Sequence, residues 1–204
     1  MAEFGPNSIT LRDGTPAELR HATPEGAAAG VEYLRELYAR AADYLIAQGD
    51  EYDPADPAYP ERLGKTLADP RSLHVYAWSG GRAIGDAIFQ GGSKRRNLHT
   101  GWFGVGVHPD WQGRGLGRVL TRTVLDWAAG HREIERVTLR AFAGNARAIA
   151  LYRSFGFVET DRARHAFKLE DGSYTDDLGM CLYVKPGVAA EGFRTYDPGG
   201  RPGQ

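Results

Sequence analysis

The sequence predicts an α/β (α+β) protein built as one domain around a mixed β-sheet. Stretches in which apolar residues recur at helical spacing are intermixed along the chain with stretches in which apolar and polar residues alternate. The 204 residues, 42% of them hydrophobic and 25% charged, provide enough apolar surface for one sizeable core. The order of these stretches shows no internal repeat and predicts no second domain.

Charge and cysteine content exclude several classes of function. A formal net charge of −1 gives no general attraction to nucleic acid or to an anionic membrane. The single cysteine, Cys181, excludes an internal disulfide and a multi-cysteine metal site, and the histidines lack metal-binding spacing. The first residues do not resemble a signal peptide, and no apolar run approaches the ~20 residues of a membrane helix. We therefore expect a cytoplasmic protein with no metal, membrane or nucleic-acid partner.

The first part of the chain is expected to form a hairpin, two helices and a second hairpin. Short strands flank Asp13-Gly14, a dipeptide that tolerates tight turns. Thr23-Pro24 is typical of a helix start, and the apolar spacing continues to about Arg40. A second short helix is expected to end near Leu67, and strands are expected on both sides of Gly80-Gly81.

An acidic segment, residues 50–61, separates the two expected helices. It contains five acidic side chains, three prolines and no basic residue, so regular structure is not expected there. Its charge would attract a cationic amine. A solvated acidic loop without a binding role is the alternative that the residues leave open.

The second part of the chain is expected to contain three strands and two helices after the strand LHTGWFGVGV. Helical spacing begins at Leu116, and alternation predicts a strand over ERVTLRA. A short helix follows and is closed by Gly156. Two strands joined at Asp171-Gly172 come next. The glycine- and proline-rich residues from Pro186 onward predict a flexible tail, in which Phe193 and Tyr196 could dock on the rest of the protein.

Residues 112–117, QGRGLG, lie between an expected strand and an expected helix and form a candidate phosphate site. Backbone N–H groups of a first helical turn point toward one region, and the helix dipole adds partial positive charge there. The three glycines carry no Cβ atom that would hold an anion away from the backbone. Arg114 and Arg118 can add charge at the rim. The alternative is a tight loop that needs positive φ, with solvated arginines.

Two common nucleotide-binding patterns do not fit. The dinucleotide pattern Gly-x-Gly-x-x-Gly fails because Leu120 occupies the position of its last glycine. Gly64-Lys65-Thr66 looks like the end of a P-loop, but the position of the leading glycine holds Tyr59.

Two motifs together resemble the GNAT superfamily of acyl-CoA N-acyltransferases. Gln112-x-x-Gly115-x-Gly117, preceded by Val105-x-Val107, is similar to the coenzyme A pyrophosphate loop of that family. Residues 145–157, with the pattern N-x-x-A-x-x-L-Y-x-x-x-G-F, are similar to its second coenzyme-side motif. The resemblance covers about residues 17–185. It includes the pattern of residues 171–180, which is common in one branch of small-molecule and protein-amine acetyltransferases.

The resemblance implies a GNAT-like mixed, mostly antiparallel sheet of about six to seven strands flanked by about four helices. The acetyltransferase domain would span 17–185, after an N-terminal extension with a short strand at 1–16 and before a flexible tail at 186–204. The implied co-substrate is acetyl-CoA. The residues implied to bind it are Val105, Val107, Gln112, Gly113, Arg114, Gly115, Leu116, Gly117, Arg118, Asn145 and Tyr152.

The resemblance also implies a direct attack of an amine on the thioester, with Tyr152 as the general acid. A phenol with an ordinary pKa of ~10 stays protonated when a thiol of pKa ~8.5 ionises, so it can hydrogen-bond the leaving thiolate. Packing of the helix against the core is the alternative role for Tyr152. Asn145 would cap the helix in either case.

Similar proteins often carry Glu at the position of Trp102, and an indole cannot accept a proton. His99 and Asp176 are therefore the candidates for a base that acts through a bound water. Trp102, Tyr174 and Asp176 are candidate acceptor-binding residues. Packing of Trp102 in the core, and stabilisation of the last hairpin by Tyr174 and Asp176, are the alternatives.

The function predicted from the sequence is acetyl-CoA-dependent N-acetylation of a primary amine of a small molecule. Acetylation of a protein or peptide amine is one alternative, and a non-catalytic acyl-CoA-binding sensor is another. The expected partner is the small-molecule amine, with a homodimer as a further option.

Overall fold

The structure is a computed structural model that describes residues 6–23, 26–41, 44–46 and 58–200. The chain divides into two compact units. The first comprises Met1–Ala42, Ala47–Gln90 and Gly104–Val124, and the second comprises Asp43–Ile46, Gly91–Phe103 and Leu125–Gln204. Strand β5 (Thr100–Val107) and helix α3 (Leu116–Gly130) each contribute residues to both units.

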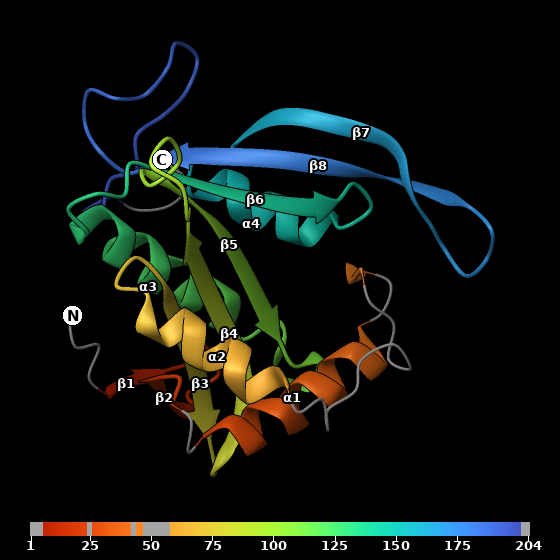
Figure 1. The fold of residues 1–204 in the computed structure, drawn as a ribbon. Helices are drawn as coiled ribbons and strands as arrows, with labels where there is room; N and C mark the ends of the chain where they lie inside the picture. Colours follow the sequence, from red (N-terminus) through yellow and green to blue (C-terminus); the bar gives the residue numbers. More distant parts are fainter. Residues whose placement is uncertain (1–5, 24–25, 42–43, 47–57, 201–204) are drawn as a thin grey trace. The chain divides into compact units, whose positions relative to one another are not determined.

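The first unit contains the first expected hairpin, both early helices and the second hairpin (Figure 1). Its complete elements are β1 (Asn7–Thr10), β2 (Pro16–His21), α1 (Ala27–Arg40), α2 (Ala58–Ala68), β3 (Leu73–Ser79) and the short 3-10 helix η2 (Pro109–Trp111), with β4 (Arg82–Gly91) nearly complete. Strands β1 to β4 pair in succession, each antiparallel to the next. Helix α1 begins at Ala27, later than expected. The Thr23 hydroxyl accepts a hydrogen bond from the N–H of Gly26 (3.2 Å), while Pro24 lies outside the described residues.

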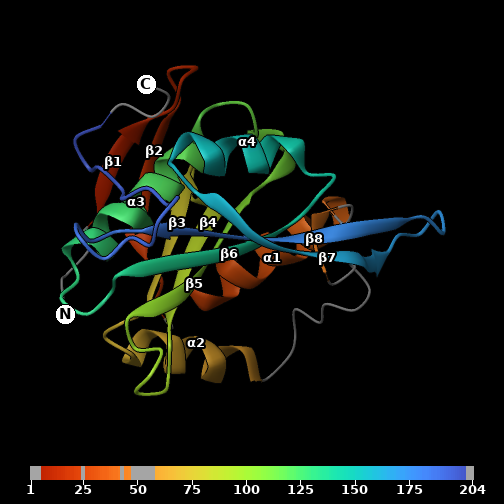
Figure 2. The ribbon, with the colours of Figure 1, turned by 90° about the horizontal axis from the view of Figure 1, so that it is seen from above.

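Helices cover both faces of the sheet in the first unit. A Cβ atom at Gly85 of β4 would lie 3.1 Å from Leu116 and 3.2 Å from Leu120, so the start of α3 packs on that face. A Cβ atom at Gly106 of β5 would lie 2.9 Å from Leu37, which places α1 on the opposite face. Figure 2 shows α2 on the same side of β3 and β4 as α1.

The second unit contains the remaining elements, β6 (Arg136–Phe142), α4 (Ala146–Ser154), β7 (Val158–Lys168) and β8 (Tyr174–Tyr183). Strand β8 pairs antiparallel with both β6 and β7, and β7 and β8 form a long hairpin (Figure 1). Strand β5 pairs parallel with β6 over three residues, Thr100–Trp102. The α4 helix ends as expected before Gly156, whose φ is 97°.

The predicted fold class is confirmed, with one correction to the number of strands. Within the described residues, the strands follow the order β1-β2-β3-β4-β5-β6-β8-β7 in a sheet of eight strands, accompanied by four α-helices. The family resemblance implied about six to seven strands. The short strand expected before Asp13, outside the implied acetyltransferase domain, is β1, which pairs with β2 from Asn7↔Leu19 to Thr10↔Pro16 and joins the same sheet.

Phe193 and Tyr196, the two residues of the C-terminal tail that could dock, both contact the second unit, and the Phe193 ring centroid lies 5.7 Å from that of Tyr183. Thr195 forms a parallel bridge with Tyr183, and the Tyr196 side chain is buried. The Tyr196 hydroxyl donates a 2.6 Å hydrogen bond to Asp126 of α3. The Tyr196 ring buries apolar surface, and its hydroxyl makes a hydrogen bond to a charged group. Together these gains offset the loss of conformational entropy when a glycine-rich segment is ordered.

We expect Tyr196→Phe to lower the free energy of unfolding by about 1–2 kcal/mol, because a buried hydrogen bond to a charged group is lost. Urea denaturation of the full chain measures this difference. Tyr174→Phe is the matched control, since the Tyr174 side chain is 54% exposed. Equal stability of the two variants would show that the tail does not contribute through this bond.

Candidate active site

The glycine-rich loop connects β5 to α3 and is built from backbone in the first unit. Gly113 and Gly115 have φ values of 84° and 88°, a region that disfavours residues with a Cβ atom. The first hydrogen bonds of α3 are donated by the N–H groups of Arg118 and Val119 to the carbonyl of Gly115. The N–H groups of Leu116 and Gly117 therefore precede the first bonds of the helix and are not used by it. This is the geometry of an anion site at a helix N-terminus.

The loop is held in place by the turn between β1 and β2. The N–H of Arg12 donates to the carbonyl of Arg114 (3.0 Å), and the Arg114 guanidinium pairs with Asp13 (2.9 Å). The same guanidinium lies 4.7 Å from the centre of the Trp111 ring and bonds the carbonyl of Asp110. Arg114 thus stabilises the loop within the protein, and a role in phosphate binding would compete with these contacts.

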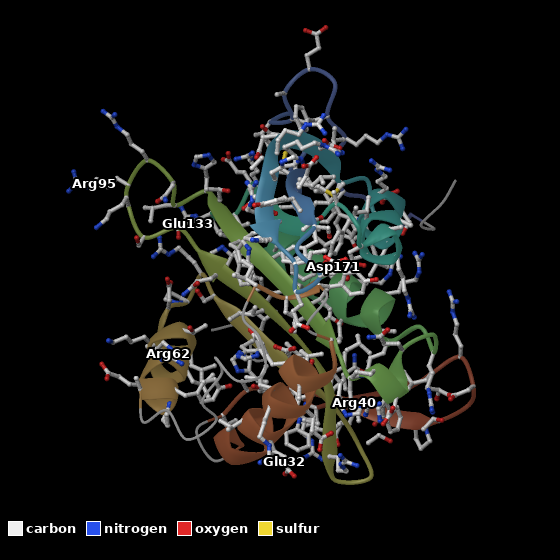
Figure 3. The ribbon with its side chains drawn as sticks, turned by 90° about the vertical axis from the view of Figure 1, so that its right-hand side faces the viewer. Glu32, Arg40, Arg62, Arg95, Glu133 and Asp171 are labelled. Carbon is white, nitrogen blue, oxygen red and sulfur yellow. The ribbon has the colours of Figure 1, made fainter. Side chains whose placement is uncertain are left out.

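A second set of contacts ties the loop to helix α1. The Glu36 carboxylate lies 2.6 Å from Nε2 of His108, the residue that follows β5. The N–H of Asp110 donates to His108 Nδ1 (3.3 Å), so we assign the ring proton to Nε2, where it donates to Glu36. This hydrogen bond lowers the pKa of Glu36. Arg40, labelled in Figure 3, binds Asp110 through two bonds of 3.0 and 2.7 Å.

Strand β5 supplies the backbone groups that were expected to contact the pantetheine. Its pairing with β6 covers Thr100–Trp102, whereas Val105 and Val107 lie further along the strand. The carbonyl of Val107 accepts a hydrogen bond from the Gln112 side chain at 3.3 Å. A carbonyl oxygen has two lone pairs, so this bond still permits a second donor.

In the second unit, Asn145 and Tyr152 are positioned by helix α4. Asn145 is the N-cap, as predicted, and its Oδ1 accepts a 3.0 Å bond from the N–H of Ala148. Tyr152 is buried between Phe103 and Phe157, with ring centroids 6.2 and 5.8 Å away, respectively. Among the described residues the Tyr152 hydroxyl has no hydrogen-bond partner. Burial raises the pKa of Tyr152 to about 12, so the phenol is protonated at neutral pH.

The two candidate base residues occupy different environments. His99 precedes β5 with an exposed side chain, and its carbonyl accepts bonds from the N–H groups of Glu135 and Arg136. Asp176 accepts a bond from the N–H of His165 (3.0 Å) and pairs with Arg164 (2.8 Å). The His165 bond first, and the Arg164 charge with it, lower the pKa of Asp176. A carboxylate stabilised in this way is a weak proton acceptor.

Two candidate acceptor-binding residues are exposed. Trp102 is 46% exposed, so the alternative that it packs in the core is wrong. Tyr174 stacks on His165 with ring centroids 5.2 Å apart and an interplanar angle of 18°. Because Tyr174 and Asp176 both contact β7, each of them stabilises the last hairpin. A role of these residues in acceptor binding stays a prediction.

The sequence reasoning missed a buried polar cluster in the first unit. Asp86 of β4 is buried and accepts hydrogen bonds from Tyr33 of α1 (2.9 Å) and from Nε2 of His74 of β3 (3.1 Å). A signal was present in the sequence, because Asp86 is the only charged residue within the apolar stretch AIGDAIF. The partners could not be identified from sequence, since Tyr33 lies 53 positions away.

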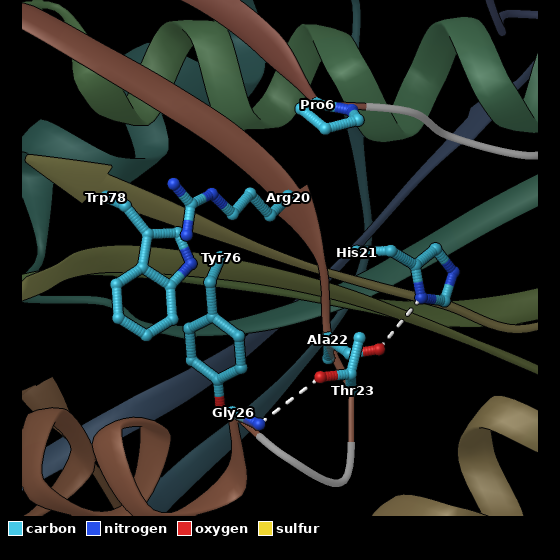
Figure 4. A pocket seen from close by; sticks show the side chains of 8 residues that line it. All are labelled: Pro6, Arg20, His21, Ala22, Thr23, Gly26, Tyr76 and Trp78. Carbon is cyan, nitrogen blue, oxygen red and sulfur yellow. Dashed lines mark hydrogen bonds between the residues drawn. The ribbon is translucent and has the colours of Figure 1, made fainter. Parts of the chain in front are cut away.

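A surface hollow of about 460 Å³ lies on the α1 side of β2 and β3 (Figure 4). Arg20, Tyr76 and Trp78 line it, and the Arg20 guanidinium stands 5.7 Å from the centre of the Trp78 ring. None of the glycine-loop residues lines this hollow. We therefore place no coenzyme in it.

The described residues contain no group of three or more His, Cys, Asp or Glu side chains arranged to hold a metal ion. In the same part of the chain, no helix is both long and apolar enough to cross a membrane.

Comparison with known proteins assigns the chain to a family. The Acetyltransferase (GNAT) family matches residues 31–157. N-alpha-acetyltransferase RimI of Mycobacterium tuberculosis is 35% identical over 114 residues, which are 56% of this chain and 70% of that protein. L-amino acid N-acetyltransferase AaaT of Escherichia coli is 26% identical over 149 residues, 73% of this chain and 89% of that protein.

The fold is shared with solved structures. A GNAT-family acetyltransferase from Streptococcus pneumoniae superimposes with a TM-score of 0.75 at 22% identity, covering 82% of this chain and 99% of that one. Together with the family match over residues 31–157, this establishes that the chain belongs to the GNAT family of acetyltransferases.

Proposed function

We propose that this GNAT N-acetyltransferase transfers the acetyl group of acetyl-CoA to the primary amine of a small molecule. The observation that carries the coenzyme part is the β5–α3 loop, where two positive-φ glycines precede a helix whose first N–H groups are unused by the helix. Such a site suits the pyrophosphate of coenzyme A. Metal ions are not part of the proposal, and a cytoplasmic location is compatible with the free, buried thiol of Cys181.

The glycine loop would bind the pyrophosphate through the backbone of residues 113–118. Leu116 is 1% exposed, so its part in binding is limited to its N–H group. Val105 and Val107 would hydrogen-bond the pantetheine, because strand β5 continues beyond the three residues paired with β6. One N–H group of this strand would also stabilise the oxyanion that forms when the amine attacks.

Tyr152 would act on the leaving sulfur chiefly as a hydrogen-bond donor. Full transfer of its proton to a thiolate of ordinary pKa ~8.5 would be uphill by about 5 kcal/mol, because burial raises the pKa of Tyr152 to about 12. A hydrogen bond from the neutral phenol avoids this cost and still stabilises the developing charge. The thiolate would then take its proton from solvent.

The nature of the acceptor separates the two enzymatic alternatives. Similarity to AaaT, named as an L-amino acid N-acetyltransferase, spans 73% of the chain and supports a free amine. Similarity to RimI, named as an N-alpha-acetyltransferase, is higher in identity but shorter and supports acetylation of a protein N-terminus. We favour the small-molecule amine because the longer match includes more of the residues outside the coenzyme motifs.

Thiol release from acetyl-CoA, measured with a panel of free L-amino acids and with short peptides that begin with alanine, tests the proposal. We expect faster release with at least one free amino acid than with the peptides. Faster release with the peptides would support the protein-amine alternative. Tight acetyl-CoA binding without thiol release for any amine would indicate the non-catalytic sensor.

The loop itself is tested by Gly115→Glu compared with Gly115→Ala. Both variants place a Cβ atom about 3.1 Å from the Arg12 side chain at a φ of 88°, so they share the backbone strain. Only Glu adds a negative charge near the pyrophosphate, worth about 4 kcal/mol at 4 Å near a protein surface. We expect calorimetry to show acetyl-CoA affinity at least tenfold weaker in Gly115→Glu than in Gly115→Ala. Equal affinities would refute the phosphate site.

For Tyr152→Phe we expect kcat to fall about 10- to 100-fold while the Kd of acetyl-CoA changes less than about threefold. The lost hydrogen bond is made to a charge that develops in the transition state and is worth ~1.5–3 kcal/mol. Steady-state kinetics and calorimetry provide the two numbers. Tyr196→Phe is the control, since it removes another buried hydroxyl and should affect stability alone. A kcat close to wild type would mean that Tyr152 only packs α4.

Trp102 is predicted to form a wall of the acceptor site, where its ring would hold a cationic amine by ~0.5–2 kcal/mol. Trp102→Ala and Trp102→Leu should then raise the KM of the acceptor about 2- to 30-fold. The melting temperature should change little, because the side chain is 46% exposed. A clear loss of melting temperature with an unchanged KM would contradict this role.

A further inference from the structure

We propose that Asp86 is the proton acceptor for the attacking amine. The inference rests on the proposed acetyl transfer and adds to it the base that Trp102 cannot provide. It starts from the buried cluster of the first unit, formed by Asp86 with Tyr33 and His74.

The carboxylate of Asp86 is fixed but retains acceptor capacity. Tyr33 donates to Oδ1 and His74 Nε2 lies beside Oδ2, so one bond is directed to each oxygen. A carboxylate offers about four lone-pair positions, of which these bonds occupy two. The side chain keeps 12% of its surface exposed, which leaves room for a water molecule or an amine to reach it.

Asp86 lies directly against the strand to which the proposed function assigns the thioester. A Cβ atom on Gly106 would lie 2.7 Å from Asp86 Oδ1 and 2.6 Å from the Tyr33 hydroxyl. Gly106 stands between Val105 and Val107, the two residues proposed to bind the pantetheine. The absence of a side chain at this position therefore brings the carboxylate next to the backbone of the proposed reaction site.

The groups that face Asp86 favour its role as a base. Phenol or imidazole side chains face Asp86 from three elements. They are Tyr33 and Tyr38 of α1, His74 and Tyr76 of β3, and Tyr59 of α2. The hydroxyls of Tyr59 and Tyr76 lie 2.9 Å apart. None of these side chains carries a fixed positive charge. Burial, and secondarily the charge of Asp86, raise the pKa of Tyr33 and of Tyr38.

The contrast with Asp176 strengthens this assignment. Asp176 pairs with a guanidinium, and its pKa is lowered, so it holds a proton poorly. Asp86 accepts hydrogen bonds from a phenol and an imidazole and lies among aromatic rings, which suit the approach of an ammonium group. Of the two aspartates, Asp86 is the one that lies against the backbone of Gly106.

The nitrogen lone pair of the amine attacks the carbonyl carbon of the thioester, and the carbon–sulfur bond breaks with its electron pair going to sulfur. One N–H proton passes to the Asp86 carboxylate, directly or through one water. Asp86 then releases this proton to solvent, while the thiolate takes one proton from solvent. The net reaction converts an amine and acetyl-CoA into an amide and coenzyme A.

The competing explanation is that Asp86 only joins α1 to the sheet. Asp126 provides a matched control, because it also accepts a bond from a tyrosine hydroxyl, that of Tyr196 at 2.6 Å. Removal of the charge at either position weakens a tyrosine–carboxylate bond. Only at Asp86 should the change alter the chemical step.

The experiment compares Asp86→Asn, Asp126→Asn and wild type, using whichever amine of the panel wild type acetylates fastest. Thiol release gives kcat from pH 5.5 to 9, and calorimetry gives the Kd of acetyl-CoA. We expect Asp86→Asn to lower kcat at least ~100-fold, the range of general base catalysis. The Kd should stay within about twofold, and Asp126→Asn should keep the wild-type kcat profile.

Several outcomes would overturn the inference. A kcat of Asp86→Asn within threefold of wild type would exclude the base role. A parallel loss of acetyl-CoA affinity would indicate a structural role. If Asp86→Asn does not fold, Tyr33→Phe replaces it, and an unchanged kcat there would equally overturn the proposal. Absence of thiol release by wild type with every amine would refute the proposed function, and this inference with it.

Discussion

Close backbone packing around strands β4 and β5 is the constraint on which the first unit depends. Gly85 and Gly106 carry no side chain, and each would bring a Cβ atom to within about 3 Å of a helix residue. The start of α3 can therefore approach one face of the sheet and α1 the other. The position of α1 in turn brings Tyr33 to Asp86 and Glu36 to His108. The candidate coenzyme loop and the buried acidic cluster both follow from this packing.

The candidate loop is held in place by side-chain contacts, including those of its own Arg114. The groups of the loop that would face a ligand are backbone N–H groups, which have no side-chain rotamers to be fixed on binding. Precision comes from neighbouring contacts, with Arg114 held by Asp13 on one side and Asp110 held by Arg40 on the other. Such exposed ion pairs contribute little to global stability. Their contribution is to order the loop, and an ordered loop would reduce the entropy cost of binding the proposed coenzyme.

The chemistry proposed for the chain divides between groups in different environments. Tyr152 lies among aromatic rings, and burial holds its proton on the phenol at neutral pH. Asp86 lies among hydroxyl and imidazole donors, which stabilise a carboxylate without a fixed cation. Trp102 of β5 stands where the family resemblance would often place a Glu carboxylate. The carboxylate of Asp86 lies against Gly106, further along the same strand. Fixed dipoles of this kind need no reorganisation during the reaction.

The sequence by itself determined the order and type of the elements, the family resemblance, the glycine loop and the cap at Asn145. These features depend on local spacing and on contiguous motifs, which can be read along the chain. Only the tertiary structure decided that Arg114 binds Asp13, that Tyr196 docks the tail and that Tyr33 meets Asp86. Each of these pairs is separated by at least 53 positions, and a contact at that separation depends on packing of distant elements. No local pattern records such packing, because many partners are compatible with one polar side chain until the fold selects one.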